Sequence, residues 1–198
     1  MIPLSIGGAV NIDLDLSIFE QPVVVFDTET TGTGRSDRLV EFGGIRFEQG
    51  RPPVAFATLI RPGIPIPWHA QNVHNISEQM VAGQPSFDRV LPDIEDFFEG
   101  ALVFAHNLSF DARLLRQSAE VTGQCMDVDG LCTVRLARRV HPERKGRGAH
   151  SLAGLAALYG IENPAAHRAL GDAETTARLL GCFVQRAPEV VAAFVACR

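Results

Sequence analysis

The alternation of apolar and polar residues along the chain predicts an α/β domain. Val23–Phe26 is a continuous apolar run of the kind that is buried on both faces of a sheet. Leu39–Phe47 and Val54–Ile60 predict two further strands joined as a hairpin, and Ala101–Ala105 predicts another short buried strand. A three-stranded meander followed by strands that alternate with helices indicates one domain with a mixed sheet.

Helical periodicity accounts for most of the remaining chain. The clearest case follows Ser86, a predicted helix cap, with apolar residues spaced by three and four positions from Phe87 to Phe98. The same periodicity predicts helices at Asp111–Val121, Thr133–Val140, Ser151–Tyr159 (closed by Gly160 as a left-handed cap) and Ala173–Phe183. Residues 61–85 are punctuated by proline and glycine, which indicates an irregular loop with one short helix near Ser77–Val81.

The two ends of the chain differ from this central part. Apolar and polar residues alternate from Asn11 to Ile18, which suggests a half-buried extra strand within an N-terminal extension of residues 1–21. Residues 22–187 are assigned to the main domain, and residues 188–198 to a C-terminal tail. The alternating N-terminal segment is also where we expect an interface if the chain forms a homodimer.

Composition places the chain among ordinary globular domains. It has 198 residues, of which 46% are hydrophobic and 21% charged, which argues against disorder, collagen and coiled coil. No apolar run is long enough for a transmembrane span, and no signal peptide is recognisable, so we expect a soluble, cytoplasmic protein without membrane association. The four cysteines show no metal-binding or redox spacing, and we expect them to be reduced and mostly buried.

The charge distribution says more than the net charge of −5. Between Arg135 and Arg147 a basic stripe of six cationic residues stands against one acid, while the rest of the chain is acidic. The stripe consists of Arg135, Arg138, Arg139, Arg144, Lys145 and Arg147. Such a stripe suits a polyanion held at one place, and it equally suits a solvated helix and loop.

Carboxylates gather at three points of the predicted topology. Asp27 and Glu29 follow the first apolar strand and project from the same face of it, so they repel each other unless a cation neutralises them. Asp111 opens a helix, and Asp172 leads into the last long helix, five residues after His167. Taken singly, these residues are equally well explained as strand-end acids, helix caps and a surface histidine.

Together the same residues indicate phosphoryl chemistry. Aspartate and glutamate oxygens suit Mg²⁺ or Mn²⁺, and two such ions can clamp the attacking and leaving oxygens of an in-line displacement. A histidine, with an ordinary pKa near 6.5, suits the role of general base for the attacking water.

In these residues the sequence resembles a known family, the DEDDh (DnaQ-like) 3′→5′ exonucleases. The resemblance runs from Val23 to Phe183 and rests on three motifs in order: F-D-T-E-T-T-G from Phe26, H-N-x-x-F-D from His106 and H-R-A-L-G-D-A from His167. It implies a ribonuclease H-like fold, a five-stranded mixed sheet flanked by helices. It also implies a metal-dependent exonuclease domain, residues 22–187, that releases nucleoside 5′-monophosphates from single-stranded 3′ ends.

The resemblance also implies roles for individual residues. Asp27, Glu29 and Asp172 would bind a first Mg²⁺ or Mn²⁺, which orients the water that His167 deprotonates, and Asp27 with Asp111 would hold a second ion. The residues that would bind the terminal nucleotide are Thr30, His74, His106, Asn107 and Phe110. From the basic stripe, we predict that Arg138, Arg139, Arg144, Lys145 and Arg147 contact backbone phosphates.

Several positions depart from the family pattern. The leucine that commonly follows Thr-Thr-Gly is Thr33 here, and His74-Asn75-Ile76 replaces the usual His-Gly-Ile. The residues before Asp27 and the short stretch after the last helix favour a stand-alone exonuclease over a replicative proofreading subunit, so association with a polymerase stays open. Single-stranded DNA is the expected substrate. The alternatives are an exoribonuclease of the ribonuclease T or oligoribonuclease type, a catalytically silent nucleic-acid-binding module, and a phosphatase or phosphotransferase.

Overall fold

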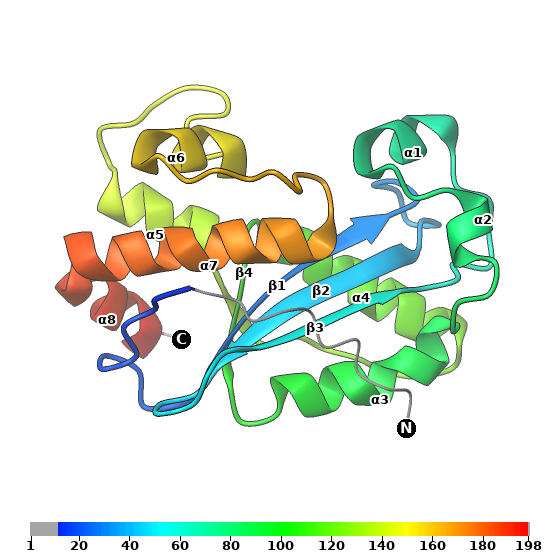
Figure 1. Cartoon of the computed structure of the whole chain (residues 1–198), viewed down its shortest axis with the longest axis horizontal. Helices are drawn as coiled ribbons and strands as arrows, with labels where there is room; N and C mark the ends of the chain where they lie inside the picture. The colour runs from blue at the N-terminus through cyan, green and yellow to red at the C-terminus, as the bar shows by residue number, and fades with distance from the viewer. Residues whose placement is uncertain (1–11, 198) are drawn as a thin grey trace.

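The computed structural model describes residues 12–197, and they form a five-stranded mixed sheet covered by helices on both faces (Figure 1). The strands are β1 (Val23–Thr30), β2 (Leu39–Phe47), β3 (Val54–Leu59), β4 (Leu102–Ala105) and β5 (Gly130–Cys132). Their order in the sheet is β3-β2-β1-β4-β5, with β1 in the centre. The β1–β2 and β2–β3 pairs are antiparallel, whereas β1–β4 and β4–β5 are parallel, which confirms the predicted mixed sheet.

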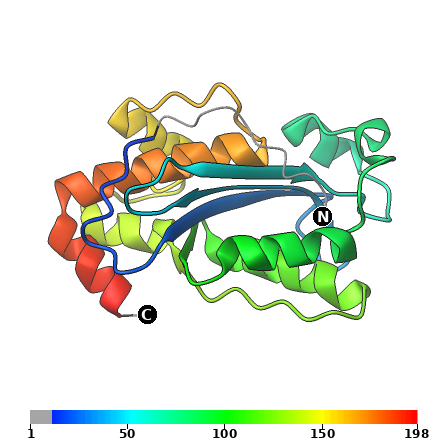
Figure 2. The same ribbon diagram turned by 60° about the horizontal axis from the view of Figure 1, so that its bottom comes forward.

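Helices fill two layers around this sheet. They are α1 (Trp68–His74), α2 (Glu78–Val81), α3 (Phe87–Phe98), α4 (Leu108–Val121), α5 (Thr133–Val140), α6 (Leu152–Tyr159), α7 (Ala169–Arg186) and α8 (Pro188–Ala196). With the sheet seen edge-on, α3 and α4 lie on one side, and α6 and α7 lie on the other (Figure 2). Val23 and Val25 pack toward α7, while Val24 and Phe26 pack toward α3 and α4, so β1 is buried on both faces as its sequence predicts.

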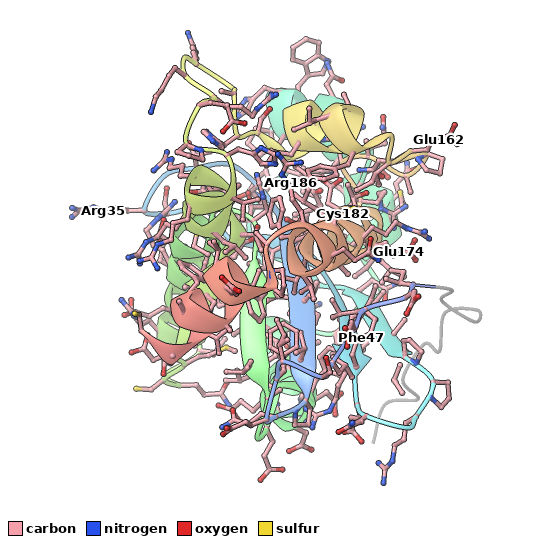
Figure 3. The ribbon with its side chains drawn as sticks, turned by 90° about the vertical axis from the view of Figure 1, so that its left-hand side faces the viewer. Arg35, Phe47, Glu162, Glu174, Cys182 and Arg186 are labelled. Atoms are coloured by element: carbon pink, nitrogen blue, oxygen red, sulfur yellow. The ribbon has the colours of Figure 1, made fainter. Side chains whose placement is uncertain are left out.

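The two ends of β1 have different surroundings. Its first residue, Val23, pairs with Phe47, the last residue of β2, at the end of the sheet that Figure 3 views. Its last residues lie at the opposite end, near α1 (Figure 1). There the register slips between Glu29 and Thr30, because Thr30 pairs with Leu39 and skips one residue of β2. Bulges of this kind commonly occur beside active sites.

Three predictions about the ends of the chain and the cysteines were wrong. Of the predicted N-terminal strand, residues 12–18 are described and form no strand, although Ile12 and Leu14 are buried and Asp13 and Asp15 exposed; Asn11 and the residues before it lie outside the described part. The predicted tail contains α8, whose Val191 and Phe194 belong to the core. All four cysteines are free, as expected, but two are exposed and two half-buried.

Smaller differences concern element boundaries. The sequence signals missed α1, which starts at Trp68 after Pro67 and has no side-chain cap, and β5, which has three residues. Helix α4 starts three residues earlier than predicted and α7 four residues earlier, so Asp111 and Asp172 lie in first turns. Ser86 stands at the predicted cap position, but its hydroxyl bonds to the carboxylate of Asp88. Gly160 is left-handed as predicted, with φ of 65°.

Within residues 12–197 no single helix is both long and apolar enough to cross a membrane. Helices α7 and α8 satisfy that condition only when taken together, and they are bent by 111° at the break between them.

Two glycines bring the start of α7 into backbone contact with its neighbours. A Cβ atom on Gly43 of β2 would lie 2.2 Å from the backbone nitrogen of Leu170, and one on Gly171 would lie 2.3 Å from the carbonyl oxygen of Ala165. Gly43 is the register partner of Asp27. The absence of a side chain at Gly43 therefore sets how closely α7 approaches β2, and its absence at Gly171 sets how closely the preceding loop packs on α7.

We predict that Gly43→Ala destabilises the fold by about 2 kcal/mol, because the added methyl group must push two backbones apart. Gly83→Ala is the matched control, since a Cβ atom there meets nothing within 4 Å. Its effect should stay within about 0.5 kcal/mol. Urea unfolding of both variants measures the difference, and equal midpoints would contradict the close packing at Gly43.

Candidate active site

Strand β1 presents two carboxylates to the layer that contains α7. Because side chains alternate along a strand, Asp27 and Glu29 project from the same face as Val23 and Val25. Both acids are partly buried. They lie within the central strand and not after its end, and both are paired with β2, Asp27 with Gly43 and Glu29 with Glu41.

Asp172 completes a cluster with these two residues. It lies in the first turn of α7, where the helix dipole favours a negative charge. One carboxylate oxygen from each of Asp27, Glu29 and Asp172 can be chosen so that all three lie within 4.8 Å of one another. Residues that are 145 positions apart in the chain thus offer three oxygen ligands at one point.

Asp111 reaches the same region from the opposite layer. It lies in the first turn of α4, is buried, and accepts a hydrogen bond of 2.7 Å from the hydroxyl of Thr28. Thr28 stands between Asp27 and Glu29 in sequence. Asp111 lies outside the three-carboxylate cluster, yet its negative charge raises the pKa of Asp27.

Burial of these acids close to one another raises their pKa values. Burial raises the pKa of Asp27 well above its usual range, and the charges of Asp111 and Asp172 raise it further. Burial is also the main reason that the pKa of Glu29 rises to about 8, and it raises that of Asp111 to about 7, against the hydrogen bond from Thr28. Near neutral pH this group of acids therefore holds protons that a divalent cation would displace. The donor set, hard oxygens at short separation, fits Mg²⁺ or Mn²⁺.

His167 lies beside the cluster, in the loop before α7. Its backbone amide donates a 3.2 Å hydrogen bond to Oδ2 of Asp172, and its side chain is exposed. Asn163, which the sequence analysis missed, donates a 2.6 Å hydrogen bond to the other oxygen, Oδ1. Both oxygens of Asp172 are thus held by the loop that carries the histidine.

Backbone strain marks three of the sequence motifs. Asn75, Asn107 and His167 have φ values of 58°, 69° and 61°, in the left-handed region that residues other than glycine rarely adopt. The conformation of Asn75 accounts for the departure from His-Gly-Ile, because asparagine tolerates the left-handed region better than other non-glycine residues. Strain of this kind clusters at functional sites.

The residues predicted to bind the terminal nucleotide have different environments. The Thr30 hydroxyl donates a 2.7 Å hydrogen bond to the carbonyl of Gly32. His74 is buried and its Nδ1 accepts from the amide of Ile76, while its Nε2 has no hydrogen-bond partner among the described residues. Asn107 is exposed at the start of α4, and half-buried Phe110 lies under the guanidinium of Arg113, 5.4 Å from the ring centre.

His106 is held by the protein through both ring nitrogens. Nδ1 lies 2.9 Å from the Thr133 hydroxyl, and Nε2 lies 3.1 Å from the carbonyl of His150. Burial lowers the pKa of His106 to about 4, so the ring is neutral near pH 7 and donates from Nε2. These contacts join the end of β4 to the loop between α5 and α6, and a contact of His106 with a nucleotide stays a prediction.

The residues of the basic stripe have different environments. Arg138, Lys145 and Arg147 are exposed, whereas Arg144 donates from Nε to the carbonyl of Ala149. The Arg139 guanidinium lies over the ring of Phe194 in α8, 4.9 Å from its centre. The loop that carries Lys145 and Arg147 reaches the active-site end of the sheet through the contact of His150 with His106.

Glu41 and Arg168 are functional candidates that the sequence analysis did not single out. Glu41 of β2 pairs in register with Glu29, and Nε of Arg168 lies 3.1 and 3.0 Å from its two carboxylate oxygens. A signal was present for each residue. Glu41 is the only acidic residue of a largely apolar strand, and Arg168 directly follows His167.

Comparison with known proteins agrees with this geometry. Residues 24–180 match the sequence profile of the RNase T family, described as exonuclease. A DNA polymerase III subunit epsilon-like protein of Rhodobacter capsulatus is 42% identical over 161 residues, which are 78% of this chain and 22% of that protein. DNA polymerase III subunit epsilon of Aquifex aeolicus is 31% identical, over 82% of this chain and 80% of its own length.

Solved structures show the same architecture. Exonuclease X in complex with 5′ overhanging duplex DNA superposes with a TM-score of 0.67 at 30% identity, covering 84% of this chain and 93% of that one. The nuclease domain of 3′hExo, a DEDDh family member bound to rAMP, has a TM-score of 0.73 at 14% identity, over 85% and 94% of the two chains. The second likeness supports the ribonuclease H-like fold.

The chain covers a small part of several relatives, for example 11% of DNA polymerase III PolC-type of Clostridium perfringens. The match to the family profile nevertheless spans most of this chain and includes all three motifs. The chain belongs to the RNase T exonuclease family, whose DEDDh members are metal-dependent, and is an exonuclease domain homologous to the 3′→5′ exonucleases of the DnaQ/epsilon and exonuclease X type.

Proposed function

We propose that this domain removes nucleotides one at a time from single-stranded 3′ ends of DNA and releases nucleoside 5′-monophosphates. The observation that carries the proposal is the cluster of Asp27, Glu29 and Asp172 with the His167 backbone hydrogen-bonded to Asp172. DNA as the substrate is supported by the similarity to exonuclease X, which was solved with DNA. A catalytically silent module would have no use for acids that repel one another at this density.

Two divalent ions, Mg²⁺ or Mn²⁺, complete the proposed site. Asp27, Glu29 and Asp172 would hold one ion, and Asp27 with Asp111 would hold the other. When bound, such ions stabilise the negative charge that develops on the phosphate and on the leaving 3′ oxygen. The protein's own contribution is to bring acids from β1, α4 and α7 to one point before the substrate arrives.

His167 would act as the general base. Its imidazole accepts a proton from the attacking water, while its amide keeps the loop against Asp172. Thr30, His74, Asn107 and Phe110 would bind the terminal nucleotide, and Lys145 and Arg147 would contact phosphates further along the strand. A homodimer, a polymerase partner and a cytoplasmic location stay predictions.

The direct test is degradation of 5′-labelled single-stranded DNA and RNA, resolved to single nucleotides, with Mg²⁺, with Mn²⁺ and with a chelator. We expect a ladder that shortens from the 3′ end of DNA, more slowly from RNA, and none with chelator or with Asp172→Asn. Immediate release of the labelled 5′ nucleotide, or cleavage that persists with chelator, would contradict the proposal. Faster degradation of RNA would instead favour the exoribonuclease alternative.

Stabilisation of the fold by a divalent metal ion should increase with pH. Glu29 titrates at about 8 in the folded protein against an ordinary value of 4.5, so the metal-free fold binds an extra proton between these values. The metal-free melting temperature should therefore fall as pH rises from 6 to 8, and millimolar Mn²⁺ should raise it more at pH 8 than at pH 6. Glu29→Gln should weaken both trends. A melting temperature that does not respond to Mn²⁺ at either pH would contradict the metal site.

Replacing His167 should separate base catalysis from metal binding. His167→Ala should lower the single-turnover rate about 10²- to 10⁴-fold and flatten its rise between pH 6 and 9. Its Mn²⁺-induced shift in melting temperature should equal that of the wild type, whereas Asp172→Ala should lose both rate and shift. A His167→Ala rate within about threefold of the wild type at every pH would show that another group is the base.

The loop that carries Lys145 and Arg147 should contribute to the affinity for single-stranded nucleic acid and not to the rate of the chemical step. Lys145→Gln/Arg147→Gln should weaken single-strand binding and reduce the salt slope by about 1.4, roughly 0.7 for each lost phosphate contact. The matched control is Arg51→Gln/Arg186→Gln, which removes two exposed charges, from the β2–β3 turn and from the last residue of α7 (Figure 3). Identical slopes for the two double variants would show that the loop is only a solvated surface.

A further inference from the structure

Glu41 is a buried carboxylate that lies beside other carboxylates, where a negative charge is unfavourable. Its side chain is 5% exposed, and it lies directly opposite Glu29 in the β1–β2 register. Opposed residues of an antiparallel pair project from the same face, so Glu41 lies on the face of the sheet that bears Asp27 and Glu29 and that α7, with Asp172, covers. A buried negative charge beside like charges is stable only when a cation and hydrogen-bond donors compensate it.

Arg168 and the start of α7 supply that compensation. Nε of Arg168 contacts both oxygens of Glu41, at 3.1 and 3.0 Å, and its terminal nitrogen also bonds to Oε1. The backbone amide of Ala169 donates a further bond of 2.9 Å to Oε2. Glu41 therefore holds two consecutive residues, the first of which follows His167 directly.

The backbone around His167 is thus held by hydrogen bonds on both sides of the residue. On one side its amide is bonded to Asp172, and on the other side Arg168 and Ala169 are bonded to Glu41. Between these points His167 adopts its left-handed conformation, with φ of 61°. A strained residue keeps such a conformation only when its neighbours determine it from both directions.

We propose that Glu41 and Arg168 form a positioning pair that sets the reach of His167 toward the attacking water, an inference that rests on the proposed function. Neither residue belongs to the three-carboxylate cluster, and in this proposal both act through the histidine. Two other roles are to be distinguished from this one: stabilisation of the fold in general, and adjustment of the charge at the three-carboxylate cluster. Arg168 lies close enough to Glu29 to act on its charge, which makes the second distinction necessary.

Hydrogen exchange of the loop tests the positional part without any metal. In Glu41→Gln and in Arg168→Lys, the peptide covering residues 163–172 should exchange at least tenfold faster than in the wild type. The matched control is Glu48→Gln, which breaks the ion pair of Arg46 with Glu48 just beyond the other end of β2, and it should leave this peptide unchanged. Unchanged exchange in both site variants would overturn the proposal.

A double-mutant cycle with His167→Ala tests the mechanistic part. Glu41→Gln and Arg168→Lys should each lower kcat about 10- to 100-fold at saturating metal and leave KM within threefold. In the His167→Ala background the same substitutions should cost less than threefold, because the group that they position is gone. Their Mn²⁺-induced shifts in melting temperature should match the wild type.

Each contrary outcome has a separate meaning. Equal losses in the two backgrounds, or a smaller Mn²⁺ shift, would overturn the positioning pair in favour of a structural or electrostatic role. If Glu41→Gln fails to fold, Arg168→Lys decides the question, since the Arg168 side chain is 42% exposed and the positive charge is kept. Absence of hydrolysis by the wild-type protein would overturn the proposed function itself, which the exchange measurement does not depend on.

Discussion

Mutual repulsion of carboxylates is the constraint on which the rest of this structure depends. Asp27, Glu29, Glu41, Asp111 and Asp172 meet at one end of the central strand, and most of them are in surroundings that disfavour charge. Three of these acids, Asp111, Asp172 and Glu41, accept hydrogen bonds from neighbouring residues. Thr28 bonds to Asp111, Asn163 and the His167 amide bond to Asp172, and Arg168 bonds to Glu41. The fold holds these acids in place, and in the proposed function divalent cations would compensate their charge.

The layered architecture explains how so many acids reach one place. Strand β1 is buried on both faces, so its polar end is the first point along it where side chains meet solvent. Helix α4 starts at that end from one layer, and α7 starts there from the other. Each helix brings an acid in its first turn, where the helix dipole lowers the electrostatic cost of the charge.

The sequence was sufficient for the residues that belong to compact motifs. Asp27, Glu29, Asp111, His167 and Asp172 stand in short motifs that the sequence alone singles out, and the structure brings the carboxylates of Asp27, Glu29 and Asp172 together. The Thr28, Asn163 and Glu41 contacts were not predicted, because each joins segments whose proximity only the tertiary fold creates.

The same limit applies to the elements that were predicted incorrectly. Side chains in residues 12–18 do alternate between buried and exposed, since Ile12 and Leu14 are buried. An extended segment that packs on a helix, however, shows the same two-residue period as a strand. The backbone oxygen of Asp13 lies against Gly181 of α7, and no periodicity reports which partner a segment has. Strand β5 has three residues and α1 lacks a side-chain cap, so neither gives a local signal of useful length.

The register of β1 has a consequence for how such a domain can diversify. A slip of one residue would bring the hydroxyls of Thr28 and Thr30 to the face where the carboxylates now stand, and the strand is paired on both sides along its first half. Insertions and deletions are therefore excluded from the hydrolytic centre. Loops around the site, such as the 31–38 turn, the 61–67 segment and the 141–151 loop, can change in length without moving β1. A domain built this way can exchange one nucleic-acid substrate for another through its rim while its chemistry stays the same.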